Sequence, residues 1–181
     1  MGVITGMTWR LPGKINFLPP VCFVSLFLLL CSCSSKPTKD QLIVGTVTRV
    51  HDGDSIHITP KTSNRVVIRL AGIDAPEIKQ TFGIQSRDKL RSLILNKTAQ
   101  AHCHKLDKYQ RHVCVVRYEN KDINLQMVAA GMAWHYKQYQ NEQSVLDRRR
   151  YAAAQTSAQK RQLGLWGMQA VAPWEFRQAQ Q

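Results

Sequence analysis

The predicted fold depends above all on one segment, Arg65-Val66-Val67-Ile68-Arg69-Leu70-Ala71-Gly72-Ile73-Asp74-Ala75-Pro76-Glu77. Residues 65–73 are rich in β-branched and apolar side chains, which favour a strand. Pro76 ends that strand, because proline has no amide hydrogen to donate within a sheet. Residues 42–50 and 55–59 are predicted as two earlier strands, and Asp52-Gly53-Asp54 between them is a hairpin signal. We therefore expect the three strands to form a meander.

The remaining chain adds two predicted strands and three predicted helices. The strands cover residues 98–104 and 112–118, and the helices cover residues 86–95, 123–130 and 142–162. Ser86 is a candidate N-cap of the first helix, and Gly131 and Gly164 end the other two. Five short strands with helices between and after them fit an α+β fold, a five-stranded OB-fold β-barrel with about three helices. The alternative is a different α+β sandwich.

Three carboxylates and one arginine fall near the ends of the first strands: Asp54, Asp74, Glu77 and Arg69. Acidic oxygens in a rigid cluster bind a hard cation, and an arginine beside them grips a phosphate with a planar fork of donors. A metal ion and an arginine facing one phosphate are the parts needed to cleave a phosphodiester. Taken singly, the same residues also fit ordinary turns and strand ends, because Asp and Gly favour turns.

The net charge points to a polyanionic partner. The chain has 181 residues, which suits one domain plus an extension, with 25 Lys and Arg against 12 Asp and Glu, a formal net charge of +13. Nucleic acid and an anionic membrane surface are the partners that such an excess favours. A solvated basic surface is the plainer alternative. We expect the protein to be a monomer.

The first 33 residues have the composition of an export signal. Arg10 and Lys14 precede an apolar run over residues 21–31 that is short for a transmembrane helix. The run ends in Leu30-Cys31-Ser32-Cys33, which resembles a bacterial lipoprotein box with the lipid on Cys33. The alternative is a cleaved signal peptide without lipid. We expect a protein anchored by lipid in the bacterial cell envelope, or a periplasmic or secreted one if Cys33 is not lipidated.

These boundaries divide the chain into four parts: a signal at residues 1–33, a polar tether at 34–41, a domain at 42–166 and a C-terminal tail at 167–181. Cleavage before Cys33 would remove Arg10 and Lys14 and leave 23 basic and 12 acidic residues, a net charge of +11. The basic character therefore belongs to the domain.

Two cysteines, Cys103 and Cys114, lie in the domain on strands that are predicted to be neighbours. An exported protein meets an oxidising compartment, so these cysteines can form a disulfide, and two buried thiols are the alternative. His102-Cys103-His104 also raises the idea of a zinc site, but alternate residues of a strand face opposite ways.

Four motifs follow one another along residues 42–166: Asp52-Gly53-Asp54-Ser55, then Arg69-Leu70-Ala71-Gly72-Ile73-Asp74-Ala75-Pro76-Glu77, then Asp107-Lys108-Tyr109-Gln110-Arg111, then Gly164-Leu165-Trp166. Each motif alone is weak evidence. In this order, and in an exported basic chain, they resemble the thermonuclease (staphylococcal nuclease-like) family. The resemblance implies an OB-fold endonuclease that uses calcium and cuts DNA and RNA with little sequence preference, leaving 3′-phosphates.

The resemblance also implies roles for single residues. Asp54 and Asp74 match the family's calcium-binding carboxylates, and the backbone carbonyl of Ala75 matches its third protein ligand. Arg69 and Arg111 match the two arginines that contact the scissile phosphate. Glu77 matches the carboxylate assigned as general base.

The family's nucleotide pocket uses tyrosines and a lysine, which Lys108 and Tyr109 match in the turn. Tyr136 and Tyr139 lie in about the right region of the chain, although ordinary aromatic packing explains them as well. Gln110 stands where the pattern often has glycine. If that position needs a positive φ, glutamine would strain the turn and re-aim Arg111.

The same barrel with a dead site, holding nucleic acid or a protein partner, is the competing functional hypothesis. Degenerate members lose a carboxylate or an arginine, whereas this chain keeps all five of the matched charged residues: Asp54, Arg69, Asp74, Glu77 and Arg111. The sequence therefore favours catalysis.

Overall fold

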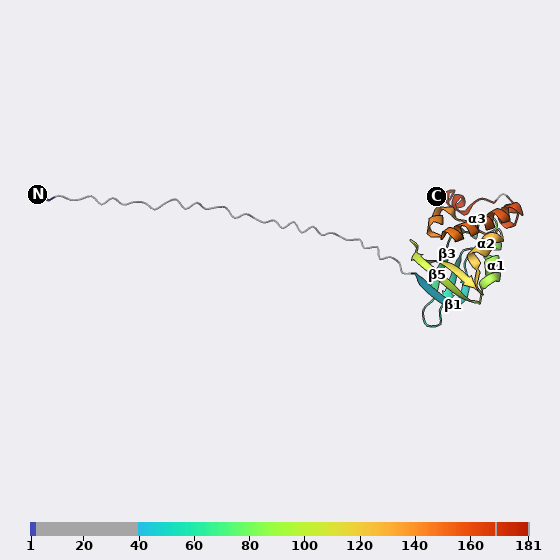
Figure 1. The fold of residues 1–181 in the computed structure, drawn as a ribbon, viewed down its shortest axis with the longest axis horizontal. Coiled ribbons are helices and arrows are strands. Elements are labelled where there is room, and N and C mark those ends of the chain that lie inside the picture. Colours follow the sequence, from blue (N-terminus) through green and yellow to red (C-terminus); the bar gives the residue numbers. More distant parts are fainter. Residues whose placement is uncertain (3–39, 169, 181) are drawn as a thin grey trace. The chain divides into compact units, whose positions relative to one another are not determined.

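A closed barrel of five strands forms the body of the computed structural model, which describes residues 1–2, 40–168 and 170–180 (Figure 1). Its strands are β1 (Gln41–Val50), β2 (Ser55–Thr59), β3 (Val66–Leu70), β5 (Thr98–Leu106) and β6 (His112–Tyr118). Neighbouring strands follow the order β3-β2-β1-β5-β6, and a parallel pairing between β3 and β6 closes the barrel. The predicted α+β fold with a five-stranded OB-fold barrel is therefore confirmed.

The strand β1 shows how the sequence pattern sets the barrel interior. Ile43 and Val47 point inward and are buried, as alternation along a strand requires. The pairing with β2 shifts between Val47 and Arg49, and after this irregularity Val50 is the buried residue. The extra residue leaves Arg49 exposed and increases the local twist, which helps the sheet to curl.

The predicted third strand is two strands in the structure. β3 ends at Leu70, and a separate short strand, β4 (Ile73–Asp74), pairs with β8 (Trp134–His135) outside the barrel. Gly72 makes the turn between β3 and β4 with φ of 71°, a conformation that glycine adopts without steric cost. This turn moves Asp74 out of the barrel wall and onto a second, two-stranded sheet.

The helices differ from the prediction mainly at their starts. They are α1 (Gly83–Ile94), α2 (Ile123–Ala129), α3 (Val145–Lys160) and α4 (Pro173–Gln178), with short 3₁₀ helices η1 (Lys137–Glu142) and η2 (Gly164–Gly167). Ser86 does not cap α1, which begins three residues earlier. Its hydroxyl is buried within the helix and donates to the Met132 carbonyl oxygen at 2.6 Å. Ser144 caps α3 instead, because its hydroxyl accepts from the Asp147 amide at 3.0 Å.

The helices α1, α2 and α3 extend the barrel core. In Figure 1, α3 lies at the end of the barrel away from the β2–β3 loop, and α1 lies beside the barrel. Leu90 of α1 and Met127 of α2 are fully buried in the same apolar cluster as the barrel residues. Tyr151 joins this cluster from α3, and its hydroxyl donates to the Asp122 carboxylate at 3.1 Å. Burial and this neighbouring carboxylate raise the pKa of Tyr151, so the phenol stays protonated as a donor.

A second apolar cluster holds the C-terminal part of the chain. Trp134, Leu165 and Ala172 are buried together, and Trp166 and Trp174 pack against them. Residues 167–181 were predicted as a tail with no helix or strand, whereas the structure has α4 there. Pro173 at the first turn of α4 has the fixed φ that starts a helix.

The predicted signal, Cys33 and all but the last two residues of the tether fall outside the described residues, so these predictions are untested. Gln41, assigned to the tether, is the first residue of β1. Within residues 40–168 and 170–180, no helix has both the length and the apolar character needed to cross a bilayer.

Candidate active site

The turn after β1 holds Asp54 in a fixed orientation at the mouth of the barrel. Asp54 is buried, and its Oδ1 accepts from the Ser55 hydroxyl at 3.0 Å while its Oδ2 accepts from the Ala75 amide at 2.7 Å. Gly53 permits this arrangement, because a Cβ there would lie 1.8 Å from the Ser86 hydroxyl oxygen of α1. The carboxylate is thus oriented by its own motif, Asp52 to Ser55, and by the motif that contains Ala75.

Arg69 brings the two predicted metal ligands together. Its Nη2 lies 3.0 Å from Oδ1 of Asp74 and 3.2 Å from Oδ2 of Asp54, so one nitrogen touches both carboxylates. Its Nη1 donates to the carbonyl oxygens of Leu70 and Ile73 at 2.8 and 2.9 Å. The guanidinium therefore joins β3 to β4 as well as carrying the charge that offsets the acids.

Burial makes this acid cluster costly to ionise. Burial, together with the nearby charge of Asp54, raises the pKa of Asp74 despite its contacts with arginines. Burial and Asp54 also raise the pKa of Asp52 to about 7, and Oδ1 of Asp52 accepts from the Asp54 amide at 3.0 Å. Unfavourable negative charge in a buried cluster is the condition under which a bound cation stabilises a site most.

Glu77 lies on the loop after β4, at the rim of the same cleft. Its backbone amide donates to the side-chain oxygen of Gln80 at 3.2 Å, and its Oε1 accepts from Nη1 of Arg177 at 2.8 Å. Arg177, on α4, also contacts Asp74. Arg177 belongs to none of the four motifs and was therefore not predicted as a site residue. Pro173 was the signal that could have revealed the start of α4, although not the position of this helix beside the site.

Arg111 reaches the cleft from the loop between β5 and β6. Its Nε donates to Oδ2 of Asp107 at 2.7 Å, and its Nη1 lies 3.4 Å from the Ser55 hydroxyl. Gln110 has φ of 60°, so this position does need the left-handed conformation that its glycine counterpart would adopt freely. The two bonds from Arg111 to Asp107, through its amide and its Nε, hold the arginine toward the cleft in spite of Gln110.

The proposed substrate-binding residues line the same cleft, which has a volume of about 630 Å³. Tyr109 is exposed, with Nζ of Lys108 5.0 Å from the centre of its ring. Tyr136 also lines the cleft and stacks on Trp174, with ring centres 5.6 Å apart. Tyr139 lies beside Tyr136, so the region that the sequence indicated does meet the turn that carries Lys108 and Tyr109.

The donor set suits a hard cation that completes its shell with other oxygens. Among the described residues, no three His, Cys, Asp or Glu side chains are grouped closely enough to hold a metal by themselves. Asp54 and Asp74 supply two carboxylates, and the predicted third ligand is the backbone carbonyl of Ala75. Calcium accepts such a mixture of carboxylate, carbonyl and water oxygens, whereas zinc prefers nitrogen and sulfur.

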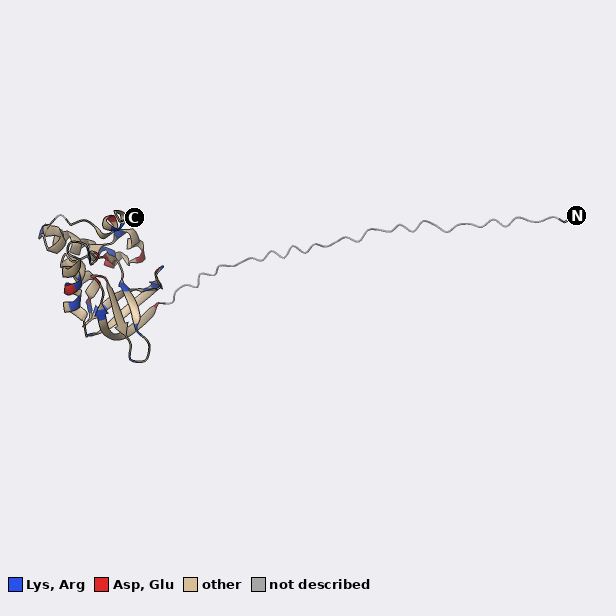
Figure 2. Cartoon of the chain, turned by 180° about the vertical axis from the view of Figure 1, so that it is seen from behind, with Lys and Arg blue, Asp and Glu red and all other residues tan. Residues whose placement is uncertain are grey.

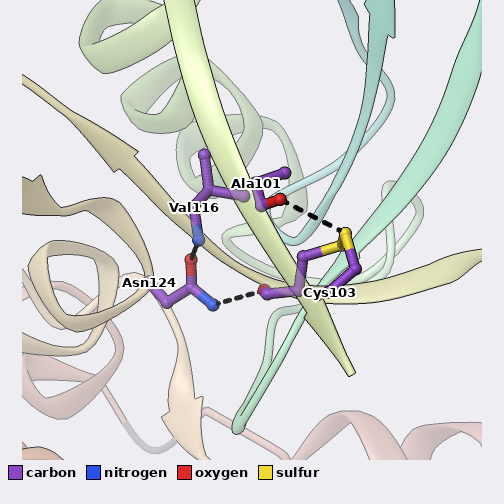
Figure 3. The surroundings of a disulfide bond; sticks show 5 residues. Ala101, Cys103, Val116 and Asn124 are labelled. Carbon is purple, nitrogen blue, oxygen red and sulfur yellow. Dashed lines mark hydrogen bonds between the residues drawn. A yellow bond between two sulfur atoms is a disulfide. The ribbon is translucent and has the colours of Figure 1, made fainter. Parts of the chain in front are cut away.

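The structure joins Cys103 and Cys114 in a disulfide across β5 and β6 (Figure 3). The two residues are directly opposite in the strand register, which is why their sulfurs meet. Next to them, the buried Asn124 side chain donates to the Cys114 carbonyl and accepts from the Val116 amide (Figure 3). A disulfide-bonded Cys103 also leaves no thiolate for the zinc site that His102-Cys103-His104 raised.

The chain is similar to known nucleases. The family described as staphylococcal nuclease homologue matches residues 67–168. An uncharacterized endonuclease of Haemophilus influenzae is 36% identical over 141 residues, which cover 78% of this chain and 73% of that protein. An uncharacterized endonuclease of Escherichia coli O157:H7 is 36% identical over 164 residues, covering 90% of this chain and 97% of that protein. A micrococcal nuclease of Shigella flexneri is 34% identical over 145 residues, covering 75% and 80%.

The barrel, the charged cleft and these relatives define an enzyme of the nuclease class. The chain belongs to the staphylococcal nuclease family, which confirms the resemblance drawn from the four motifs.

Proposed function

We propose that this protein is a calcium-dependent endonuclease that hydrolyses phosphodiester bonds of DNA, RNA or both with little sequence preference. One observation carries the proposal: Nη2 of Arg69 lies within 3.2 Å of both Asp54 and Asp74. Glu77 and Arg111 line the same cleft. Acids for a cation, the carboxylate of Glu77 and two arginines are thus in one place.

Asp54, Asp74 and the Ala75 carbonyl would hold calcium. When bound, calcium polarises a phosphoryl oxygen and offsets its negative charge. The chain's own contribution is rigidity, because the Ala75 amide and the Ser55 hydroxyl fix both oxygens of Asp54 before any ligand arrives. A preorganised carboxylate loses little further freedom on binding.

Glu77 is the proposed general base. Its side chain is 39% exposed at the cleft, so a water molecule can reach the carboxylate. Within hydrogen-bonding distance it would orient that water, accept its proton and direct the oxygen toward phosphorus.

Arg69 and Arg111 would stabilise the charge that builds up on the phosphoryl oxygens in the transition state. Nη1 of Arg69 is engaged by two backbone carbonyls, which leaves its Nη2 edge toward the acids and the cleft. Nε of Arg111 is engaged by Asp107, which leaves its Nη groups with a single contact at 3.4 Å. Both arginines are therefore held in fixed positions at the cleft, with Nη2 of Arg69 paired to Asp54 and Asp74.

The net charge of the whole chain, +13, favours a polyanion as partner. Figure 2 shows Lys and Arg positions on both the barrel and the helices, and the chain has 25 Lys and Arg against 12 Asp and Glu. Tyr109 and Lys108 on the exposed turn offer a ring for a nucleobase and a charge for a phosphate. We propose that binding is non-specific and weakens steeply with salt, as phosphate contacts require.

Digestion of single- and double-stranded DNA and RNA by the purified protein, with calcium and with excess chelator, tests the proposal. We expect cleavage only with calcium. Glu77→Gln should slow it by about 10²- to 10⁴-fold, while Asp88→Asn, at an exposed carboxylate of α1, should match the wild type. Undiminished cleavage in chelator would show that calcium is not required. Binding of nucleic acid without cleavage under all conditions would favour the alternative, a catalytically inactive binding module.

We further propose that the enzyme acts in the bacterial cell envelope as a monomer anchored by lipid on Cys33. The support is the sequence of residues 1–33 alone, with its basic start, apolar run and lipoprotein-like box. More than one acyl chain is needed for stable attachment, at about 0.8 kcal/mol per buried CH₂ group. Cys33→Ser should release the protein or leave its precursor unprocessed, and an unchanged fractionation and mass would support simple secretion instead.

A further inference from the structure

A third arginine contacts the acid cluster from outside the barrel. Nη2 of Arg177 lies 2.8 Å from Oδ2 of Asp74, and its Nη1 lies 2.8 Å from Oε1 of Glu77. One guanidinium therefore bridges a proposed metal ligand and the proposed general base. None of the sequence motifs includes this residue.

The backbone that carries Arg177 is well anchored. Trp174, one turn earlier on α4, stacks on Tyr136 and meets Trp134 edge-on at 6.1 Å between ring centres. Gln80 adds a link on the other side, because its side chain donates to the Val171 carbonyl and accepts from the Glu77 amide. The position of Arg177 beside the site is thus built into the packing of α4.

The two arginines that contact Asp74 differ in how firmly they are held. Arg69 engages Oδ1 of Asp74 and is 15% exposed, with two backbone carbonyls fixing its other nitrogen. Arg177 engages Oδ2 with a side chain that is 41% exposed, and its side-chain hydrogen bonds among the described residues go to carboxylates alone. If a cation takes an oxygen of Asp74, the side chain that can leave is Arg177.

We propose that Arg177 is an internal competitor of the metal, the residue that sets how much divalent cation the site requires. This inference rests on the proposed function, since it takes Asp74 as a metal ligand. Without metal, Arg177 neutralises Asp74 and Glu77. A divalent cation at Asp74 repels the guanidinium, which turns toward solvent and releases Glu77 at the same time. Metal binding and the freeing of the base are one event because one side chain blocks both.

Calcium titration of the metal-free full-length protein by isothermal calorimetry, without substrate, tests this directly. Removing a positive charge in contact with a ligand oxygen should tighten calcium binding by about tenfold in Arg177→Ala and Arg177→Gln. Arg177→Lys keeps the charge but not the fork, so its affinity should fall between those of Arg177→Gln and the wild type. Arg161→Ala, at an exposed arginine that ends α3, is the matched control and should bind calcium like the wild type.

Thermal unfolding gives a second readout that does not depend on activity. In chelator, Arg177→Gln should melt below the wild type because Asp74 and Glu77 lose their partner, and calcium should then raise its melting temperature by more than it raises that of the wild type. An unchanged or weaker calcium affinity, or an equal rise in melting temperature, would overturn the inference.

The result separates this inference from the proposed function. If the wild type binds no calcium, or if Asp54→Asn binds it equally well, the metal assignment itself fails. If the wild type binds calcium through Asp54 and Arg177→Gln binds it no more tightly, only the role of Arg177 fails.

Discussion

The barrel wall and the C-terminal helix both deliver an arginine to Asp74, and they hold it in different ways. Arg69 comes from β3 and is fixed by two backbone carbonyls in addition to the acids. Arg177 comes from a helix of six residues, and its bonds are to the acids alone among the described residues. The difference shows that an arginine side chain beside an acid can be fixed there or able to leave, depending on whether backbone carbonyls also bind it.

The largest expected effect concerns Arg69, the arginine that the backbone fixes. Arg69→Lys should slow nucleic-acid cleavage by about 10²- to 10³-fold, because lysine cannot place two donors on the phosphoryl oxygens. It should also lower the free energy of unfolding by about 1 to 3 kcal/mol, since the Leu70 and Ile73 carbonyls lose their donor. Single-turnover kinetics and denaturant unfolding measure the two effects.

Arg161→Lys is the control for that measurement and should change neither quantity. Loss of activity in Arg69→Lys with an unaltered unfolding free energy would show that the bonds to the backbone are dispensable, and the distinction between the two arginines would weaken.

The next effect tests the anchoring of the C-terminal helix. Trp174→Ala removes the ring that joins α4 to Tyr136 and Trp134, and should lower the free energy of unfolding by about 3 kcal/mol. The mean position of Arg177 would then no longer be fixed, so calcium affinity should rise in the same direction as in Arg177→Gln. Trp174→Phe, which keeps a stacking ring, should lose less stability, and an equal loss in both would argue against the stack.

A smaller effect concerns the charge of the acid cluster itself. The pKa of Asp52 is about 7 in the folded protein, against 3.8 ordinarily, so between these values the folded state binds the proton and the unfolded state does not. Stability from this group is therefore present at low pH and declines as the pH rises toward 7. Asp52→Asn should remove the decline, with a gain of about 2 kcal/mol at pH 8 and less at pH 5.

Thermal unfolding in chelator at the two pH values measures that gain. The substitution keeps the oxygen that accepts from the Asp54 amide, so the turn should persist. A gain of equal size at pH 5 and pH 8 would mean that Asp52 is ionised at both.

The smallest effect lies at Gln110, whose φ of 60° is unfavourable for a side chain with a Cβ. Gln110→Gly should raise the free energy of unfolding by about 0.5 kcal/mol, the relief of strain less the greater freedom of glycine in the unfolded chain. Asn96→Gly, at φ of 62° on the loop before β5, is the matched comparison. Asparagine tolerates this conformation better than glutamine, so its gain should be smaller, and an equal gain would remove any special strain from the turn beside Arg111.

The barrel wall could be predicted from the sequence because its information is local. Alternating β-branched residues mark the strands, and the Asp52-Gly53-Asp54 turn and the Pro76 stop fix where the acids fall. The motif raised a positive φ at Gln110 only as a condition, and the structure shows φ of 60° there. Ser86 was wrongly predicted as an N-cap, because the sequence does not distinguish a capping serine from a serine buried inside a helix. The hydrogen bond from its hydroxyl to the Met132 carbonyl shows that it is buried inside α1.

The C-terminal contribution could not be predicted, because it depends on a contact across 103 residues of chain. Nothing in Arg177 or its neighbours encodes the distance to Asp74. Whether Cys103 and Cys114 form a disulfide could not be predicted for a related reason. Predicted strands do not give their register, and only the pairing of Cys103 with Cys114 in the sheet brings the sulfurs together.

The double role of Arg69 limits which inactive variants of this protein can still fold. The same guanidinium holds the turn between β3 and β4 and, on the proposed chemistry, faces the phosphate. A substitution of Arg69 that abolishes activity also lowers the stability of the fold, so few such inactive variants accumulate as intact protein. Inactive descendants that keep the fold should therefore arise through Glu77, whose side chain makes one ion pair among the described residues, with Arg177. In a mutational screen that scores abundance and cleavage separately, changes at Glu77 should separate the two scores, and changes at Arg69 should lower them together.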